Sequence, residues 1–415
     1  MARLDGDRTV TGAMIAGVLT AGAVVGGAVT ARTARRMSAP RSARPTAVLG
    51  VDEAAGEIRF APTPEALLPG CYSFWFAGGR GHARVGRVVG RDGHAVVRQL
   101  LGVDTGDVAL AEDGRFNGWM HLTPEPLGLP WSSERVQTTQ GAVPAWAVPG
   151  GDGRRWAVLV HGRSSVRQEA LRAVPVLHDN GWSVLLPAYR GDGEAPDGER
   201  QRYAVADAEW VDVESAVLHA LDAGAAEVVL VGWSSGASIV LATAQRSRLR
   251  DVITGVVLDS PVLDAAEALL TRGAGVPSPV RHGALSLLGS RWGGLVGADR
   301  LDLDPAGRAD PDALRVPVLL LHSEDDGVAS IDAARAFAAA RPGLVRLVAF
   351  TGARHTRLWN LDAARWEGAV GAWLRRDEEA LDALSGRGGS SARRGGRSRR
   401  AAAPPATPSP AAPDR

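Results

Sequence analysis

The sequence predicts an α/β protein with a doubly wound, mostly parallel sheet, a small N-terminal β-rich domain and an N-terminal membrane-spanning helix. Three observations predict these parts. Nearly continuous apolar runs alternate with helical patterns over residues 134–384. Short apolar segments, cut by Gly and Asp-Gly pairs, fill residues 47–133. An uncharged stretch spans residues 9–31, near the N-terminus.

Composition excludes several kinds of chemistry. The chain has 415 residues and is 45% hydrophobic, which is enough for a substantial core. All 47 basic residues are arginine, and 46 Asp and Glu residues nearly balance them. The lack of lysine excludes Schiff-base, Ser/Lys and Walker-type lysine chemistry. The single cysteine, Cys71, excludes an intramolecular disulfide and a thiolate metal cluster.

The uncharged run at residues 9–31 favours a membrane anchor. At 1.5 Å per residue it is long enough to cross a hydrocarbon layer of about 30 Å. We therefore assign residues 1–46 to an apolar helix and an Arg-rich linker. A cleaved signal peptide is the alternative, because residues 29–31, Val-Thr-Ala, would serve as a cleavage site, and a buried apolar helix is a further one.

The arginines around the run predict its orientation. Arg3 and Arg8 precede the run, whereas a larger group follows it: Arg32, Arg35, Arg36, Arg41 and Arg44. Positive charge is enriched on the cytoplasmic side of a membrane span. The anchor therefore predicts a membrane-bound protein whose following domains lie in the cytoplasm, while a cleaved signal would instead predict secretion.

Residues 47–133 are expected to form hairpins of a small β-rich domain. Segments such as HARVGRVVG and HAVVRQLLGV end at turn residues, among them the pair Asp92-Gly93. The region contains no recognisable chemical motif.

The C-terminal tail, residues 385–415, is predicted to be disordered. It has almost no large apolar residue, so it cannot repay the entropy of ordering. It is rich in arginine and proline, but no aromatic residue is interleaved for base stacking. We therefore expect no nucleic-acid partner.

Residues 134–384 carry the pattern of a parallel sheet covered on both faces. The predicted strands are nearly continuous apolar runs at residues 156–160, 182–189, 226–232, 252–259, 316–322 and 345–350. Helical patterns lie between them, and residues 134–149 are expected to form an antiparallel hairpin before the first of these strands. Ligands of such sheets bind at the carboxyl ends of the strands.

A candidate nucleophile lies where the run VVLVG meets a helix start, in the stretch GWSSG. A nucleophile on a tight strand-to-helix turn needs small residues two before and two after it. Centring Ser234 places Gly232 and Gly236 there, whereas centring Ser235 would place Trp233 at a position where its indole clashes. Ser234 is therefore the nucleophile candidate. The backbone N–H of Ser235, at the helix N-terminus, is a candidate oxyanion donor.

A serine nucleophile needs a base and a group that orients this base. Downstream, one predicted strand ends in two carboxylates, Asp325 and Asp326, and the next ends in a loop that carries His355. The chain order Ser, Asp, His is the one that this type of fold uses. His355 is therefore the candidate base, and one of the two aspartates must accept its other ring N–H.

The run HSEDD, residues 322–326, resembles the α/β-hydrolase superfamily, particularly its serine esterase-like and prolyl-oligopeptidase-like members, whose pattern here reads His-Gly-x-x-Asp-x-x-Val-Pro. The resemblance covers about residues 134–384. Aligning the two patterns makes Asp326 the acid. Ser323 departs from the glycine and Ala329-Ser330 from Val-Pro, so Asp325 remains the alternative, with Asp259 as an outside candidate.

The same resemblance implies the remaining parts of a catalytic site. The run HGRS, residues 161–164, looks like the His-Gly-x motif, in which the residue after glycine supplies an oxyanion N–H. The resemblance thus implies that the backbone N–H groups of Arg163 and Ser235 form the oxyanion hole. We expect His161 to brace this loop and not to act as a catalytic base. Residues 264–314 interrupt the strand rhythm where the superfamily inserts a cap over the site.

These residues predict a serine hydrolase that cleaves a carboxylic ester, or a related acyl bond, through an acyl-enzyme intermediate. The expected partners are a small ester or acyl substrate and the membrane; no metal or cofactor is required. A peptidase or an acyltransferase of the same fold is an alternative, and a catalytically inactive scaffold that binds a partner or small ligand is another. The sequence gives no signal for the oligomeric state.

Overall fold

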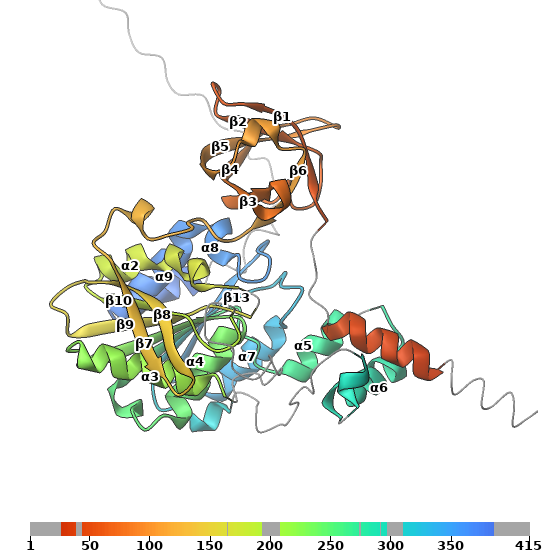
Figure 1. Cartoon of the computed structure of the whole chain (residues 1–415). Helices are drawn as coiled ribbons and strands as arrows, with labels where there is room; N and C mark the ends of the chain where they lie inside the picture. The colour runs from red at the N-terminus through yellow and green to blue at the C-terminus, as the bar shows by residue number, and fades with distance from the viewer. Residues whose placement is uncertain are drawn as a thin grey trace, which may run out of the picture.

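The computed structural model describes residues 26–38, 44–163, 165–192, 208–273, 275–290, 292–296 and 310–385. It contains a β-barrel, a sheet flanked by helices, and a small helical cluster beside the sheet (Figure 1). Residues 1–25 and 386–415 lie outside the described residues, so most of the predicted membrane span and nearly all of the predicted disordered tail fall there.

The β-rich domain is a closed barrel of six strands in the order β1-β2-β5-β4-β3-β6. Every neighbouring pair is antiparallel, as hairpins require. The strands are β1 Thr46–Asp52, β2 Glu57–Phe60, β3 Tyr72–Phe76, β4 Gly81–Arg91, β5 Val96–Thr105 and β6 Asp113–Asn117. The prediction of a β-rich domain is confirmed, but its closure was not foreseen. Closure depends on β6, which pairs with both β1 and β3.

The barrel core is aromatic. Phe60, Phe74 and Phe116 lie with ring centroids about 5 Å apart in mutually tilted orientations. Beside them, the fully buried Arg98 donates to four main-chain carbonyls, so its charge is solvated by peptide dipoles instead of water.

The second sheet has eight strands in the order β14-β13-β12-β11-β9-β10-β8-β7. It is parallel from β10 to β14, and the predicted hairpin forms its antiparallel edge as β7 and β8. The strands are β7 Ser132–Thr138, β8 Gly141–Val148, β9 Arg155–Val160, β10 Ser183–Pro187, β11 Glu227–Trp233, β12 Ile253–Asp259, β13 Val318–Ser323 and β14 Val345–Phe350. The predicted doubly wound, mostly parallel sheet is confirmed.

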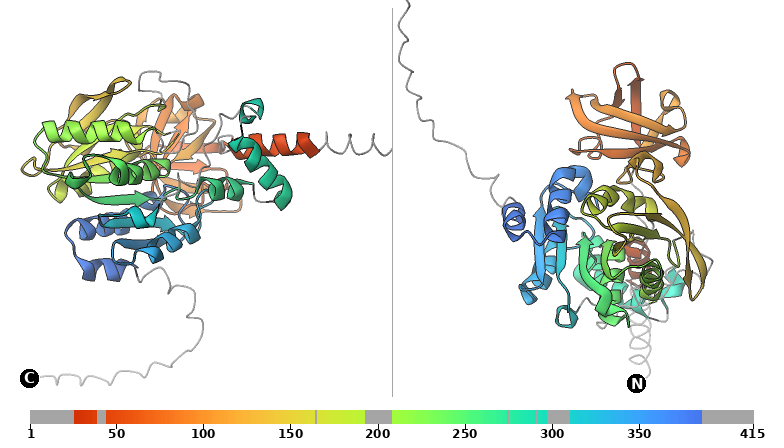
Figure 2. Two further views of the ribbon diagram at one scale, coloured as in Figure 1. Left: turned by 90° about the horizontal axis from the view of Figure 1, so that it is seen from below. Right: turned by 90° about the vertical axis from the view of Figure 1, so that its left-hand side faces the viewer.

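Helices cover both faces of this sheet (Figure 2). One face packs against α3 Trp210–Asp222, α4 Ser235–Arg246 and α7 Ile331–Ala340. The other packs against the 3₁₀ helix η4 Arg167–Ala173 and the helices α2 Val174–Asp179, α8 Leu358–Leu361, α9 Ala363–Leu374 and α10 Glu378–Ser385. The strand runs are apolar throughout because both faces are buried.

The helical cluster joins the start of the described chain to the predicted cap insertion. A helix over residues 26–38 packs on α5 Ala265–Arg272 and α6 Ser278–Gly289, with Met37 and Leu288 buried between them. Both views of Figure 2 place these helices side by side. Residues 26–31 of the predicted membrane span thus belong to a helix that contacts protein. None of the described helices is both long and apolar enough to traverse a bilayer.

Candidate active site

The turn that carries Ser234 is strained and closely packed. Ser234 has φ 54° and ψ −118°, between the end of β11 and the start of α4. A Cβ atom on Gly232 would come within 2.5 Å of the Gly236 carbonyl oxygen, and one on Gly236 within 2.3 Å of the His161 carbonyl oxygen. Only glycine fits at these two positions. Such strain costs about 1–3 kcal/mol and persists only where the surroundings enforce it.

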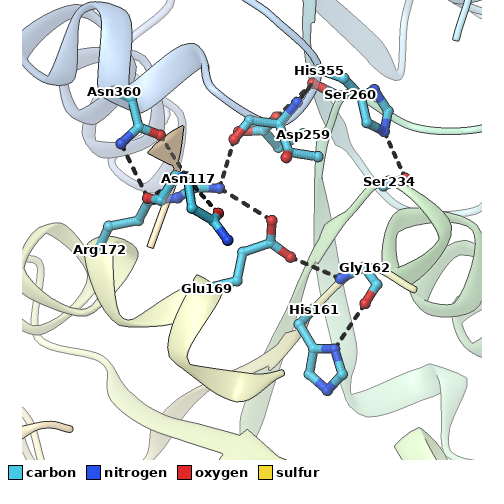
Figure 3. A network of polar contacts seen from close by, with 12 residues as sticks. Asn117, His161, Gly162, Glu169, Arg172, Ser234, Asp259, Ser260, His355 and Asn360 are labelled. Atoms are coloured by element: carbon cyan, nitrogen blue, oxygen red, sulfur yellow. Dashed lines mark hydrogen bonds and ion pairs between the residues drawn. The ribbon is translucent and has the colours of Figure 1, made fainter. Parts of the chain in front are cut away.

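A chain of hydrogen bonds links Ser234, His355 and Asp326 (Figure 3 shows the first of them). His355 Nε2 lies 2.8 Å from Ser234 Oγ, and His355 Nδ1 lies 2.7 Å from Asp326 Oδ2. The structure therefore brings together three predicted residues that come from the loops after β11, β13 and β14. With Nδ1 protonated, Nε2 is free to accept the serine proton.

Asp326 is held as a carboxylate by its surroundings. Its side chain is fully buried, and burial alone raises the pKa of a carboxyl. The hydrogen bond and charge of His355 act against this effect, as do the backbone N–H groups of Val328 and Ala329, which donate to Oδ1 at 2.8 and 3.0 Å. Together they hold the pKa of Asp326 below its ordinary value, which keeps the acceptor ionised.

His322 lies behind Asp326 and closes this side of the site. Its side chain is fully buried, with Nε2 at 3.2 Å from the Ala329 carbonyl oxygen and 3.6 Å from Asp326 Oδ2. Burial lowers the pKa of His322, which favours the neutral ring, and Nε2 is placed to donate its proton to the carbonyl. The sequence motif contains this histidine, but we predicted no role for it from the sequence.

The other two acid candidates have different partners. Asp325 Oδ2 accepts a hydrogen bond from the backbone N–H of Gly352 at 2.6 Å and so braces the loop that leads to His355. Asp259 is completely buried at the end of β12, where it accepts from Trp366 Nε1 and Ser260 Oγ, both at 2.8 Å. His355 meets Asp326 and neither of these.

The predicted oxyanion donors lie beside Ser234, but one of them already donates a hydrogen bond to a side chain. A Cβ atom on Gly162 would lie 3.2 Å from Ser234 Cβ, so this loop runs directly against the nucleophile. The Arg163 N–H donates to Ser235 Oγ at 2.7 Å. Ser235 is the first residue of α4, so its own N–H has no acceptor within the helix. The Ser235 hydroxyl must turn aside before both amides can serve one oxyanion.

The loop of Arg163 is braced by its neighbours. Tyr189 donates from its hydroxyl to the His161 carbonyl oxygen at 2.9 Å, and the two rings stack with centroids 4.5 Å apart. His161 Nε2 lies 3.3 Å from Asp192 Oδ2. Glu169 Oε2 accepts from the Gly162 N–H at 3.0 Å. His161 thus lies where we expected it to brace this loop.

Sequence reasoning missed a buried polar network under the site (Figure 3). Glu169 and Arg172 both come from η4, and Asn360 comes from α8. Arg172 Nη1 donates to Asn360 Oδ1 at 2.8 Å, and Arg172 Nη2 lies 3.8 Å from Glu169 Oε1. In the sequence the first two look like polar positions of an amphipathic helix. Their partners lie far along the chain, so no local signal reveals their role.

Within the described residues, no group of three or more His, Cys, Asp or Glu side chains is arranged to hold a metal ion. The chemistry proposed below uses only side chains and backbone amides of the chain.

Comparisons with known proteins place the two domains differently. Residues 47–117 match a family described only as a domain of unknown function. No curated protein matches the chain. Among solved structures, the chain is similar to an esterase of Pyrococcus furiosus, with 17% identity, 62% of this chain and 96% of that chain covered, and a TM-score of 0.46.

Two further solved structures are similar over a comparable share of the chain. A thermophilic esterase from Thermogutta terrifontis is 20% identical, with 59% of this chain and 98% of that chain covered and a TM-score of 0.41. A bromoperoxidase from Bacillus anthracis is 19% identical, with 59% and 100% covered and a TM-score of 0.44. Residues 157–369, more than half of the 415 residues, match the alpha/beta hydrolase family, and the protein therefore belongs to that family.

Proposed function

We propose that the protein is a serine hydrolase that cleaves carboxylic esters or related acyl bonds through an acyl-enzyme intermediate. The observation that carries this proposal is the unbroken chain of hydrogen bonds from Ser234 through His355 to Asp326, with distances of 2.8 and 2.7 Å. A hydroxyl next to a base that a buried carboxylate orients is the arrangement that nucleophilic acyl transfer requires.

The first half of the reaction follows from this geometry. His355 Nε2 takes the proton of Ser234 as Oγ attacks the substrate carbonyl carbon, and Asp326 stabilises the imidazolium. The N–H groups of Arg163 and Ser235 donate to the carbonyl oxygen as it gains charge. Collapse of the tetrahedral intermediate transfers the proton from His355 to the leaving alcohol and leaves the acyl group on Ser234.

Water completes the cycle in an equivalent pair of steps, in which water is the nucleophile and Ser234 is the leaving group. His355 removes a proton from water, the hydroxide attacks the acyl carbon, and Ser234 leaves with the proton returned by His355. An acceptor other than water in this step would make the protein an acyltransferase, and an amide substrate would make it a peptidase. An ester is the substrate we favour, because an alcohol is a better leaving group than an amine and its departure is less demanding.

A fluorophosphonate probe tests the nucleophile. We expect it to label the wild-type protein and not Ser234→Ala, because the probe forms a covalent bond with the activated serine. Ser235→Ala is the matched control, since it removes the neighbouring hydroxyl and keeps both N–H donors, and it should still be labelled. Folded wild-type protein that resists labelling would contradict the proposal and favour the inactive scaffold.

The length of the acyl group is tested with a series of p-nitrophenyl esters from acetyl to long-chain acyl. We expect kcat/KM to peak at one chain length, as it does when the acyl group must fit a binding site of limited size. Hydrolysis of peptide p-nitroanilides in preference to every ester of the series would instead identify a peptidase.

We also propose that residues 9–31 attach the protein to a membrane with the hydrolase domain in the cytoplasm. The uncharged run and the arginines that follow it support this proposal. Full-length protein should pellet with membranes and be released by detergent. Recovery in the soluble fraction would contradict attachment, and loss of the first residues in the mature protein would identify a cleaved signal.

A further inference from the structure

We infer that the β-barrel is a working part of the active site, because it positions the catalytic histidine through a buried clasp. The clasp consists of Gly118, Arg172, Thr356 and Asn360. It joins the barrel exit, which is Gly118 directly after the last barrel strand, to the loop of His355. This inference rests on the proposed serine hydrolase function and assigns a role in that reaction to a domain whose family has no described function.

The clasp begins at the residue that follows the catalytic base. Thr356 has φ 54°, a left-handed conformation that is unfavourable for a β-branched residue. Two buried side chains hold it there. Its N–H donates to Ser260 Oγ at 3.1 Å, and its carbonyl oxygen accepts from Arg172 Nη2 at 2.8 Å. The backbone of the histidine loop is therefore fixed from both sides directly after His355.

Arg172 connects this loop to the barrel exit. The residue is only 2% exposed, and its Nη1 donates to the Gly118 carbonyl oxygen at 3.2 Å and to Asn360 Oδ1 at 2.8 Å. Gly118 directly follows the last barrel strand, β6. A guanidinium is planar and rigid, so it fixes the spacing of the groups that it bridges. One side chain thus sets the distance between the barrel exit and Thr356.

Asn360 makes the same connection from the other side. Its Nδ2 donates to the carbonyl oxygens of Cys71 and Gly118 at 2.9 and 3.1 Å, and its own carbonyl oxygen accepts from the Cys71 N–H at 2.8 Å. The barrel backbone lies so close that a Cβ atom on Gly70 would come within 2.0 Å of the Asn360 carbonyl oxygen. The start of β3 is therefore pressed against α8.

A third contact lies between these two. Arg357 donates to the Phe116 carbonyl oxygen at 3.1 Å, and its guanidinium lies 5.7 Å from the centre of the Tyr72 ring. Phe116 belongs to β6 and Tyr72 to β3, the two barrel strands nearest the clasp. Residues 356–360 are thus bonded to the barrel, directly or through Arg172, at both strands.

The element that carries Arg172 also serves the oxyanion loop. Glu169, one turn earlier on η4, accepts from the Gly162 N–H at 3.0 Å and lies 3.8 Å from Arg172. The barrel, η4, the oxyanion loop and the histidine loop therefore form one connected polar network (Figure 3). Arg172 and Asn360 touch no reacting atom, so they are positioning residues. A misplacement of about 1 Å at a catalytic group can cost about 100-fold in rate.

A pair of glycine substitutions tests the contact from the barrel side. Gly70 and Gly79 have φ of 96° and 90°, so alanine brings similar backbone strain at both. Only at Gly70 does the added Cβ press on Asn360, because Gly79 has nothing within 4 Å. On a p-nitrophenyl ester, we expect Gly70→Ala to lower kcat about 10- to 100-fold with KM changed less than about twofold. Gly79→Ala should leave both constants unchanged.

A set of arginine substitutions tests the clasp itself. Arg172→Met should lower kcat about 10- to 100-fold at constant KM, and Arg172→Lys should recover part of the loss, because an ammonium can still donate to Thr356. The matched control is Arg341→Met. Arg341 also donates to main-chain carbonyls, those of Pro311, Asp312 and Leu314, but lies before β14, at the opposite end of the sheet. It should lose stability without losing kcat.

All variants are compared at a temperature at which circular dichroism shows each to be folded. Unchanged kcat in Arg172→Met, or equal losses in Gly70→Ala and Gly79→Ala, would overturn the inference. A loss in Arg172→Met that Arg341→Met matches would also overturn it, since general stability would then explain both. These outcomes require an active wild-type enzyme, whereas wild-type protein without esterase activity or probe labelling would refute the proposed function itself.

Discussion

Arg98 in the barrel and Arg172 in the hydrolase domain are both almost fully buried, yet their acceptors come from different places. Among the described residues, the acceptors of Arg98 are carbonyl oxygens of its own domain, those of Ala66, Leu68, Gly70 and Gly86. Arg172 donates to two segments that are distant in the sequence, one at Gly118 and the other at Thr356 and Asn360. The burial and the donor are the same, but the connections differ.

The difference shows what a buried arginine contributes. Arg98 closes the barrel over its own loop at residues 66–70, so its bonds stabilise one domain. Arg172 fixes the spacing between the segment that carries His355 and the barrel exit, so its hydrogen bonds hold the catalytic base in position. A buried guanidinium therefore indicates function only when its acceptors belong to parts of the chain that must keep a defined distance.

The largest expected effect sets the scale for this comparison. Asp326→Asn keeps the shape of the acid but should lower kcat about 10⁴-fold, because the amide favours the wrong tautomer of His355. Asp325→Asn should lower kcat less than about tenfold, since Asp325 accepts from the Gly352 N–H and does not meet the ring. Steady-state hydrolysis of a p-nitrophenyl ester measures both. A larger loss in Asp325→Asn would assign the acid role to that residue.

The next prediction concerns the barrel arginine alone. Arg98→Met leaves four carbonyls without this donor: those of Ala66 and Gly86 are buried and those of Leu68 and Gly70 partly buried. Each buried carbonyl left unsatisfied costs about 1–3 kcal/mol. We expect the free energy of unfolding to fall by at least about 3 kcal/mol in urea titrations, while folded molecules keep kcat within about threefold. If kcat of the folded protein fell as far as in Arg172→Met, the two arginines would not differ in role.

The smallest effect is expected at Asp259, as a dependence of stability on pH. Burial raises the pKa of Asp259 above its ordinary value, although Arg172 and the hydrogen bonds from Ser260 and Trp366 act against this rise. The folded state thus holds the proton more tightly than the unfolded chain. The stabilisation that this proton brings is complete below the unfolded pKa, about 4, and is lost as pH rises through the folded pKa.

Asp259→Asn imitates the protonated form at every pH. Its melting temperature should therefore gain on that of the wild type as pH rises from about 4 to 7, with kcat changed less than about fivefold. If instead the melting temperature of the wild type gained on that of Asp259→Asn over the same range, the ionised carboxylate would stabilise the fold, as a counter-charge to Arg172.

The sequence alone predicted the site residues that a local constraint singles out. Gly232 and Gly236 single out Ser234 because the turn leaves no room for a Cβ atom, and the strand pattern leads to the loop of His355. Strand periodicity likewise predicted the parallel sheet. Choosing between Asp326 and Asp325 needed a motif, because both follow the same strand and only backbone geometry decides which one faces the imidazole.

The rest depends on contacts between distant parts of the chain. Asn360 bonds to Cys71, 289 positions away, and Arg172 bonds to Asn360 across 188 positions. No periodicity records such a pairing. Barrel closure through β6 is of the same kind, since a hairpin pattern predicts neighbouring strands but not which distant strands meet. The Ser235 hydroxyl at the Arg163 amide is a rotamer, which a sequence does not specify.

The helix over residues 26–38 has a practical consequence for anyone who shortens the protein. It covers apolar side chains of α5 and α6, among them Leu269, Ala284 and Leu288. A version that starts at residue 44, at the edge of the barrel, would expose this apolar face of α5 and α6 to water. Such a truncated protein is expected to self-associate in solution even though its barrel and sheet are intact.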